Sequence, residues 1–156
     1  MLISLDNPIR GRLVKRYKRF LADVVLDDGS EVTAHCPNSG RMTKCVGDGW
    51  PTVVTHHDSP TRKLKYTLEM TCDGATWIVV NTNRANEVAH AALTAALIPE
   101  LAGYDTYRRE VKYGKNSRID ILCERGDAKC YVEVKSVSLT DDDGHYCFPD
   151  APTERG

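Results

Sequence analysis

The sequence contains no hydrophobic run close to the roughly 20 residues that a membrane-spanning helix needs. Its first residues, MLISLDNPIRGRL, lack the apolar core of a secretory signal peptide. No internal repeat or low-complexity segment is evident. With 41% hydrophobic and 28% charged residues, the 156-residue chain has the composition of a globular protein that can bury a core. We therefore expect a cytoplasmic protein that does not enter a membrane.

Closely spaced cysteine pairs are also absent. The six cysteines are scattered without C-x-x-C spacing, which argues against a disulfide framework and against an ordinary structural zinc site. Free thiols are the expectation. A zinc site is an alternative, and its ligands would come from His35, Cys36, Cys45, His56 and His57.

The sequence has almost no net charge, with a formal value of −1, so its overall charge does not indicate a nucleic-acid partner. The distribution of charge is more informative, because a local basic stripe can attract phosphates even on a neutral protein. A solvated charged surface is the competing interpretation. The N-terminal basic residues are Arg10, Arg12, Lys15, Arg16, Lys18 and Arg19, whereas Asp141, Asp142 and Asp143 form an acidic run.

The first half of the chain has the pattern of short strands. FLADVVLDDGSEVTAHC alternates apolar and polar residues on both sides of DDGS, which predicts a hairpin with Gly29 at the positive-φ position. WPTVVTH, YTLEMTC and WIVVNT are further candidate strands, and Asp73-Gly74 is a second tight turn. This spacing favours a small β-barrel or sandwich.

The second half begins with the pattern of a helix. NTNRANEVAHAALTAALIPEL opens with Asn and Thr residues able to cap a helix, continues with alanines at helical spacing and stops near Pro99. Three candidate strands follow at 107–113, 117–124 and 129–139. The gaps between them are too short for crossover helices, so we expect an antiparallel meander packed on the helix. The domain boundary should lie near residue 81.

Ionisable residues interrupt the last two candidate strands. Because side chains alternate between the two faces of a strand, Glu133 and Lys135 should share one face, and we expect Val132, Val134 and Val137 to fill the other. If the strands pair through the turn ERGDA, Asp120 approaches Glu133. Two neighbouring carboxylates repel each other unless a positive charge lies between them.

A divalent cation such as Mg²⁺ takes one or two carboxylates and completes its shell with water and phosphate oxygens. Such a site suits phosphodiester cleavage, in which a lysine orients or deprotonates the nucleophile. The alternative is an ordinary surface, on which Asp120 pairs with Arg118 or Lys135.

Nearly the whole chain resembles one family, the sugar fermentation stimulation protein A family of bacteria and archaea. The matching stretches are ordered and widely spaced, which makes the resemblance more specific than any short motif. They are GRLVKRYKRFLADV, VTAHCPNSGRMT, RKLKYTLE, VNTNRAN, IPELAGYDTYRREVKYG, SRIDIL, CYVEVKSVSL and FPDAPTERG.

The resemblance implies an α+β protein with two domains and DNA binding as its activity. Residues 1–80 would form an OB-like nucleic-acid-binding β-barrel, and residues 81–156 an incomplete α/β domain of the PD-(D/E)xK nuclease-like fold. Asp120, Glu133 and Lys135 match the nuclease motif as catalytic residues, with Asp120 and Glu133 as the Mg²⁺ ligands. The family's CPN-T-G loop matches Cys36 to Gly40, with Ser39 in place of Thr.

The chain departs from the family pattern in two places. The helix has Ala91 where the family usually carries Glu, and Glu87, one turn earlier, is a candidate substitute. Family members also continue past TERG into a further helix and strand that cover the sheet, whereas this sequence stops at Gly156. A domain truncated there at its C-terminus would expose apolar surface or an unpaired edge. A fragment, a split product and a shortened natural version all remain open.

These observations support three hypotheses. The first is a DNA-binding protein, with RNA as another partner, that has a Mg²⁺-dependent nuclease-like site. The second is a non-catalytic DNA-binding regulatory protein linked to sugar metabolism. The third is a remnant that does not fold. The expected phosphate contacts are Arg16, Lys18, Arg19, Arg108, Arg109, Lys112, Lys115 and Arg118, with Tyr17, Trp50 and Tyr66 as stacking or core aromatics.

Overall fold

The computed structural model describes residues 3–114, 117–137, 139–140 and 145–147. These residues form two compact units. The barrel unit contains residues 5–82 and the described residues from Val137 onward, and the sheet–helix unit contains residues 83–136 with residues 3–4. The domain boundary near residue 81 stays a prediction. No helix among the described residues is long and apolar enough to span a bilayer.

The barrel unit starts with strand β1 (Pro8–Tyr17), which the sequence did not lead us to predict. Ile9, Gly11 and Leu13 face inward and alternate with exposed arginines, so the period of two is hidden by the dense positive charge. A register shift between Leu13 and Lys15 marks a bulge in the pairing with the next strand. Such bulges increase the local twist of a strand, which helps a sheet to close into a barrel.

The remaining barrel strands agree with the predicted runs. They are β2 (Leu21–Leu26), β3 (Glu31–His35), β4 (Pro51–His56), β5 (Tyr66–Cys72) and β6 (Trp77–Val79). Gly29 has φ +85° and Gly74 has φ +101°, as the two predicted tight turns require.

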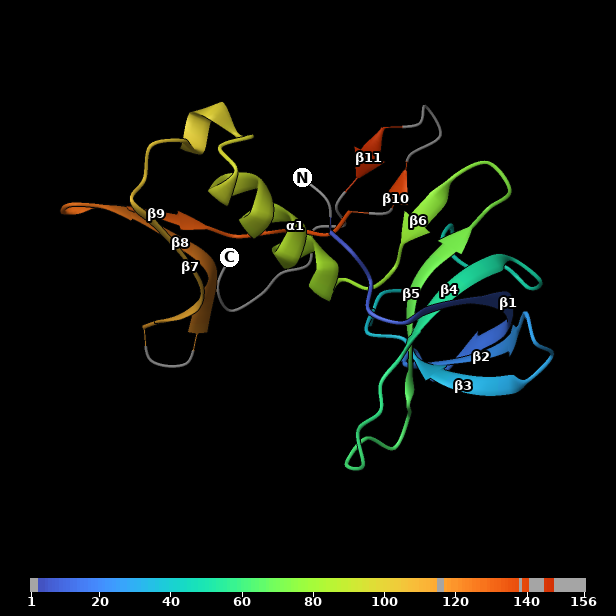
Figure 1. The fold of residues 1–156 in the computed structure, drawn as a ribbon. Coiled ribbons are helices and arrows are strands. Elements are labelled where there is room, and N and C mark those ends of the chain that lie inside the picture. The colour runs from blue at the N-terminus through green and yellow to red at the C-terminus, as the bar shows by residue number, and fades with distance from the viewer. Residues whose placement is uncertain (1–2, 115–116, 138, 141–144, 148–156) are drawn as a thin grey trace. The chain divides into compact units, whose positions relative to one another are not determined.

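The first five strands close into a barrel (Figure 1). They pair in the order β3-β2-β1-β4-β5, and β5 returns to pair with β3. This last pairing is parallel and consists of Ala34↔Tyr66 and His35↔Thr67, whereas the other barrel pairings are antiparallel. A closed five-stranded barrel is the architecture of the OB fold, so the predicted OB-like barrel is confirmed.

Aliphatic side chains fill the inside of the barrel. Leu13, Val24, Val54 and Leu68 are at most 1% exposed and belong to one apolar cluster. Gly11 allows β1 to approach β2 closely, because a Cβ placed there would lie 2.5 Å from the carbonyl oxygen of Val25. The barrel is therefore a packed core, and any ligand must bind its outside or its loops.

The sheet–helix unit contains one α-helix and one antiparallel sheet. These elements are α1 (Asn83–Thr94), the 3-10 turn η1 (Pro99–Leu101), β7 (Thr106–Tyr113), β8 (Ser117–Arg125) and β9 (Ala128–Val132). The strand order β7-β8-β9 confirms the predicted meander. Leu93 from the helix packs with Ile121 and Cys123 from β8, all at most 2% exposed, to form this unit's core.

The last predicted strand differs from the structure. It was expected to run from residue 129 to 139, but β9 ends at Val132, and Leu139–Thr140 instead form β10, which pairs with β11 (Tyr146–Cys147). The physical reason lies at Val134, whose amide donates a hydrogen bond to the Asp120 side chain. Three predicted features lie outside the described residues: the acidic run 141–143, Lys115 and the FPDAPTERG stretch.

Candidate nucleic-acid interface and candidate metal site

Asp120, Glu133 and Lys135 lie on neighbouring segments of the sheet–helix unit. The pairing Ile121↔Val132, continued by one residue, sets Asp120 opposite Glu133. Oε1 of Glu133 lies 2.7 Å from Nζ of Lys135, and both side chains are about half exposed. Val132 and Val134 pack against the unit's apolar core. The predicted alternation is therefore confirmed for residues 132–135. It is wrong for Val137, which is 36% exposed, because a period of two places residue 137 on the side of Glu133 and Lys135.

Two donors hold the carboxylate of Asp120. Asn86 Nδ2 donates to Oδ1 at 2.9 Å, and the backbone N–H of Val134 donates to Oδ2 at 2.8 Å. The Val134 amide belongs to the peptide bond that follows Glu133, so the Asp120 carboxylate lies against the backbone of Glu133. A carboxylate has about four acceptor positions, which leaves each oxygen free to accept a further partner.

Two more polar residues of this site, Asn86 and Glu110, were not predicted. The pairs Arg109↔Ile121 and Val111↔Ile119 bracket Glu110, which places it across from Asp120. Glu110 Oε1 lies 3.4 Å from Asn86 Nδ2. Glu110 has a backbone φ of +54°, which residues other than glycine rarely adopt within a strand. Strained backbone of this kind often occurs at functional sites.

Sequence signals for both residues existed. Asn86 lies in the stretch VNTNRAN and Glu110 in the stretch IPELAGYDTYRREVKYG, both of which support the family resemblance. Glu87, the proposed substitute for an acid at position 91, forms an ion pair with Arg84 at 2.7 Å. The helix residue that contacts Asp120 is thus Asn86, so the helix contributes an amide to this site.

The donor atoms of this site suit a hard cation better than zinc. Within the part of the chain that the structure describes, no three His, Cys, Asp or Glu side chains converge closely enough to hold a metal ion. The zinc alternative thus gains no support, and the Cys36 thiol instead contacts the sulfur of Met42 at 3.7 Å. Asp120 and Glu133 offer oxygen ligands, and Mg²⁺ accepts one or two carboxylates while it keeps several waters.

The barrel unit presents a basic turn between β1 and β2. Because the pairing continues to Tyr17↔Leu21, residues Lys18, Arg19 and Phe20 form the connection. Lys18 has φ +49° and Arg19 φ +63°, a left-handed conformation that costs a side-chain-bearing residue about 1–2 kcal/mol. Both cationic side chains and Phe20 are exposed to solvent. Local strain of this kind is common in loops that bind ligands.

Arg16 fixes this turn to the CPNSG loop. Its Nη2 donates to the carbonyl oxygens of Arg19 at 2.6 Å, Asn38 at 2.7 Å and Gly40 at 2.9 Å. Its Nη1 donates to the Arg41 carbonyl at 3.3 Å. The guanidinium predicted to bind phosphate is therefore occupied by backbone carbonyls, and the contribution of Arg16 is to position the two loops. Asn38 also accepts a bond from the Gly40 amide through its side-chain oxygen.

A second basic loop lies at the same end of the barrel. The connection between β4 and β5, residues 57–65, carries exposed Lys63 and Lys65. The strand pairs Leu21↔His35, His35↔Thr67 and His56↔Tyr66 lead step by step from the first turn to this loop. We call this side of the barrel, with turn 18–20 and loop 57–65, the loop end. The RKLK stretch at 62–65 was a signal for it in the sequence.

The outer face of β1, β2 and β3 is less suited to phosphate. It has a hollow of about 370 Å³ whose walls contain one lysine and two carboxylates. Asp23 in this hollow pairs with Lys15 at 3.7 Å and accepts a hydrogen bond from the Tyr17 hydroxyl. The lining residues are Val14, Lys15, Asp23, Val24, Glu31, Val32 and Thr33.

The predicted basic residues of the sheet–helix unit have mixed surroundings. Arg108 is committed to an ion pair with Glu124 at 2.7 Å, and the Arg118 guanidinium donates to the Glu110 carbonyl at 3.4 Å. Lys112 on β7 lies directly opposite Arg118 on β8 in the strand register, and both side chains are exposed. Like charges placed directly opposite destabilise a sheet, so an anionic ligand would relieve this repulsion. Arg109 is exposed as well.

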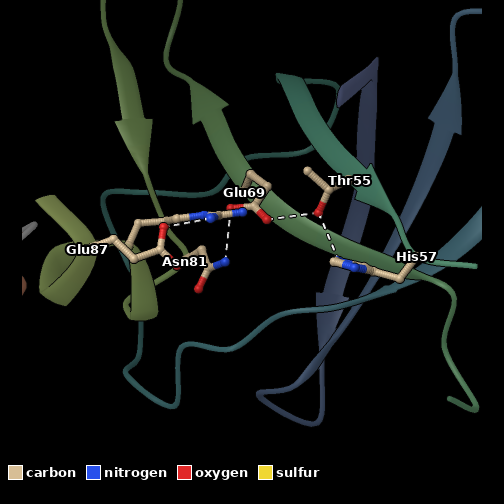
Figure 2. A network of polar contacts seen from close by, with 6 residues as sticks. Thr55, His57, Glu69, Asn81 and Glu87 are labelled. Atoms are coloured by element: carbon tan, nitrogen blue, oxygen red, sulfur yellow. Dashed lines mark hydrogen bonds and ion pairs between the residues drawn. The ribbon is translucent and has the colours of Figure 1, made fainter. Parts of the chain in front are cut away.

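A buried polar network stabilises the barrel unit (Figure 2). Glu69 in β5 is 1% exposed and accepts hydrogen bonds from Thr55 at 2.8 Å and from Asn81 at 2.9 Å. Figure 2 also shows the contact between the Thr55 hydroxyl and the His57 ring. The hydroxyl oxygen lies 3.1 Å from Nε2 of His57. Glu69 thereby links β4, β5 and the segment after β6. Sequence reasoning missed this network, because Glu69 lies within an otherwise ordinary strand.

Hydrogen bonds change the pKa of two turn carboxylates, and burial changes the pKa of a thiol. The Ser30 hydroxyl and amide lower the pKa of Asp28, and the amides of Thr76 and Ala75 lower that of Asp73. Both carboxylates therefore stabilise their turns while ionised. Burial raises the pKa of the Cys123 thiol, which keeps this thiol protonated at neutral pH.

Comparison with known proteins matches both units. The family model described as the SfsA N-terminal OB domain matches residues 14–80, and the model described as the sugar fermentation stimulation protein RE domain matches residues 83–156. A solved structure of SfsA from Pyrococcus furiosus in complex with Ca²⁺ superposes with a TM-score of 0.81 at 25% identity, over 99% of this chain and 64% of that one.

Curated relatives carry the description "sugar fermentation stimulation protein homolog". The relative from Geotalea daltonii is 51% identical over 92% of this chain and 62% of its own length. Those from Rhodospirillum rubrum and Maricaulis maris are 52% and 53% identical over 95% of this chain, and 65% and 63% of their own lengths. The chain thus spans less than two thirds of the length of these relatives.

Proposed function

Because the chain belongs to the sugar fermentation stimulation protein family, which has an OB domain at its N-terminal side, we propose that it binds nucleic acid, DNA in particular, through the loop end of its barrel. The observation that carries this proposal is the basic turn Lys18–Arg19, held in a left-handed conformation and anchored by Arg16. OB barrels use the loops that follow their first and fourth strands to bind oligonucleotides. Here both of these loops carry exposed cations.

The expected partner is a sugar-phosphate backbone. Lysine and arginine side chains at the loop end release counterions when they neutralise phosphates, so affinity should fall as salt rises. The hollow on β1–β3, with its two carboxylates, would repel the same backbone. A backbone that follows the loop end therefore avoids the acidic face of the barrel.

A binding titration against salt concentration tests this proposal. We expect wild type to bind a labelled oligonucleotide with a negative salt slope, and the double variant Lys18→Ala, Arg19→Ala to reduce that slope by about 1–2. Arg10→Ala is the matched control, because it removes an exposed cation from β1, eight residues before Lys18. Equal slopes for wild type and the double variant would refute a role for the turn.

A second candidate function is metal-dependent phosphodiester cleavage, as in PD-(D/E)xK nucleases. It is favoured by the Asp120 carboxylate, fixed against the backbone of Glu133 beside the Glu133–Lys135 pair. Its assigned catalytic residues are Asp120, Glu133 and Lys135, and a bound Mg²⁺ would polarise the phosphoryl oxygen. A solved relative is a complex with Ca²⁺, which also prefers oxygen ligands.

In this candidate site the side chains would have distinct tasks. The Asp120 and Glu133 carboxylates would hold the cation, Asn86 would keep Asp120 in place, and Lys135 would orient or deprotonate the attacking water. Basic residues on β7 and β8, Lys112 and Arg118, would attract the phosphate chain. If the site only binds, the protein is a non-catalytic DNA-binding regulator instead.

Cleavage assays with Mg²⁺ or Mn²⁺ distinguish these two outcomes. We expect wild type to degrade plasmid or single-stranded DNA, and Lys135→Ala to lose that activity. Lys129→Ala is the control, since Lys129 is an exposed lysine that contacts Glu124 at 3.6 Å on the same sheet. Equal cleavage by wild type and Lys135→Ala would remove Lys135 from the mechanism, and stable binding without cleavage would favour the regulator.

A further inference from the structure

We propose that Phe20 is a stacking platform for an unpaired base, which makes single-stranded nucleic acid the preferred ligand of the loop end. The inference rests on the proposed function, because nucleic acid must first reach this end of the barrel. Phe20 is 47% exposed and follows Lys18 and Arg19 directly in the turn. An aromatic ring beside cations is the arrangement by which many proteins bind single strands without sequence preference.

The ring is not needed for the barrel core. Phe20 does not belong to the apolar residues that pack on the described barrel core, whereas the neighbouring strand residues Leu13 and Ala22 are at most 1% exposed. Because burial of apolar surface is favourable, a ligand that covers the exposed part of the Phe20 ring gains binding free energy. The base of a nucleotide is a flat surface of suitable size for this purpose.

The backbone on both sides of the ring is fixed before any ligand arrives. The Phe20 carbonyl accepts a hydrogen bond from the Cys36 amide at 2.8 Å, and the Arg19 carbonyl accepts one from Arg16 at 2.6 Å. The same arginine holds the carbonyls of Asn38 and Gly40. A turn fixed in this way loses little conformational entropy on binding, which favours affinity.

The preference for single strands follows from access to the base. In a duplex the faces of the bases are stacked on one another, so a ring such as Phe20 can contact only an end or a flipped base. In a single strand each base can leave its neighbours at low cost. Lys18 and Arg19, together with Arg41 after the CPNSG loop, are exposed and available to the flanking phosphates.

The test compares Phe20→Leu and Phe20→Trp with wild type. Leucine keeps an apolar side chain without an aromatic face, and tryptophan keeps the face. The matched control is Trp77→Leu, which makes the same kind of change at a 42% exposed aromatic residue in β6, opposite the last residue of β5. Each variant is titrated with oligothymidylate and with a duplex of the same length, after circular dichroism has established that it folds.

We expect Phe20→Leu to weaken binding to oligothymidylate by roughly 5-fold or more, with binding to duplex unchanged. Phe20→Trp and Trp77→Leu should bind as wild type does. Equal binding of wild type and Phe20→Leu to the single strand would overturn the stacking role while the proposed function stands. An equal loss on both ligands would overturn it as well. If wild type binds neither ligand, the proposed function fails and the inference fails with it.

Discussion

Arg16 offers the sharpest test of how the loop end is held together. In Arg16→Met the side chain keeps most of its apolar stem but loses every donor. Nη2 reaches three carbonyls with only two hydrogens, so we count two charge-assisted bonds, worth about 3 kcal/mol together at this half-buried position. The buried Nε has no hydrogen-bond partner among the described residues, and its removal returns about 1 kcal/mol. The expected net loss is about 2 kcal/mol.

Tryptophan fluorescence during urea unfolding measures this loss in the right part of the molecule. Both tryptophans of the sequence, Trp50 and Trp77, lie in the barrel unit, so their signal follows this unit alone. The control is Arg19→Met, which removes the same charge from an exposed side chain in the adjacent turn. If Arg16→Met is within about 0.5 kcal/mol of Arg19→Met, the four carbonyl contacts do not stabilise the fold and the reasoning is wrong.

Four further outcomes follow from the same structure. Lys18→Gly should raise stability by about 0.5–1 kcal/mol in thermal melts, because glycine tolerates φ +49°, and yet weaken nucleic-acid binding. Gly11→Ala should destabilise the barrel by about 3 kcal/mol in urea unfolding, because its Cβ would meet backbone at 2.5 Å. Thr55→Val should cost about 1–3 kcal/mol in the same assay, since buried Glu69 loses a donor. Cys123 should react slowly with a thiol reagent at pH 8, because burial raises the pKa of its thiol. The same raised pKa leaves the free energy of unfolding unchanged below the ordinary thiol pKa and lowers it as pH rises from there through the folded-state pKa.

Each of these outcomes has a clear counter-result. A Lys18→Gly protein that melts lower than wild type would mean that the left-handed turn is not strained. Wild-type stability in Gly11→Ala or Thr55→Val would contradict the close strand approach or the buried network, respectively. Rapid labelling of Cys123, at the rate of the partly exposed Cys72, would contradict its burial.

The local pattern of the sequence predicted most elements because each of them depends on near neighbours. YTLEMTC became β5 without change, and the Gly29 and Gly74 turns have the positive φ that only glycine adopts easily. The helix ends at Thr94, before Pro99, as expected. These features need only alternation, capping and turn chemistry, which short stretches of sequence contain.

Features that depend on distant partners could not be predicted in this way. The basic side chain of Arg16 resembled a phosphate contact, but it donates to the carbonyl of Arg19 and to three carbonyls that lie 22 to 25 residues later. The length of β9 depended on Asp120, whose carboxylate takes the amide that would have continued the ladder. The pairing of β3 with β5 also required knowledge of the whole barrel, since no local motif specifies a parallel contact.

That pairing has a consequence for how the barrel moves. It consists of two residue pairs, whereas β2 and β3 share five. Fewer hydrogen bonds make the join between Ala34–His35 and Tyr66–Thr67 the easiest place for the cylinder to open, so amide hydrogen exchange should be fastest there within the five-strand ring. The two basic loops flank the same join. A polynucleotide bound to both loops would hold β3 and β5 together. Slower amide exchange at this pairing would then report nucleic-acid binding without any label on the ligand.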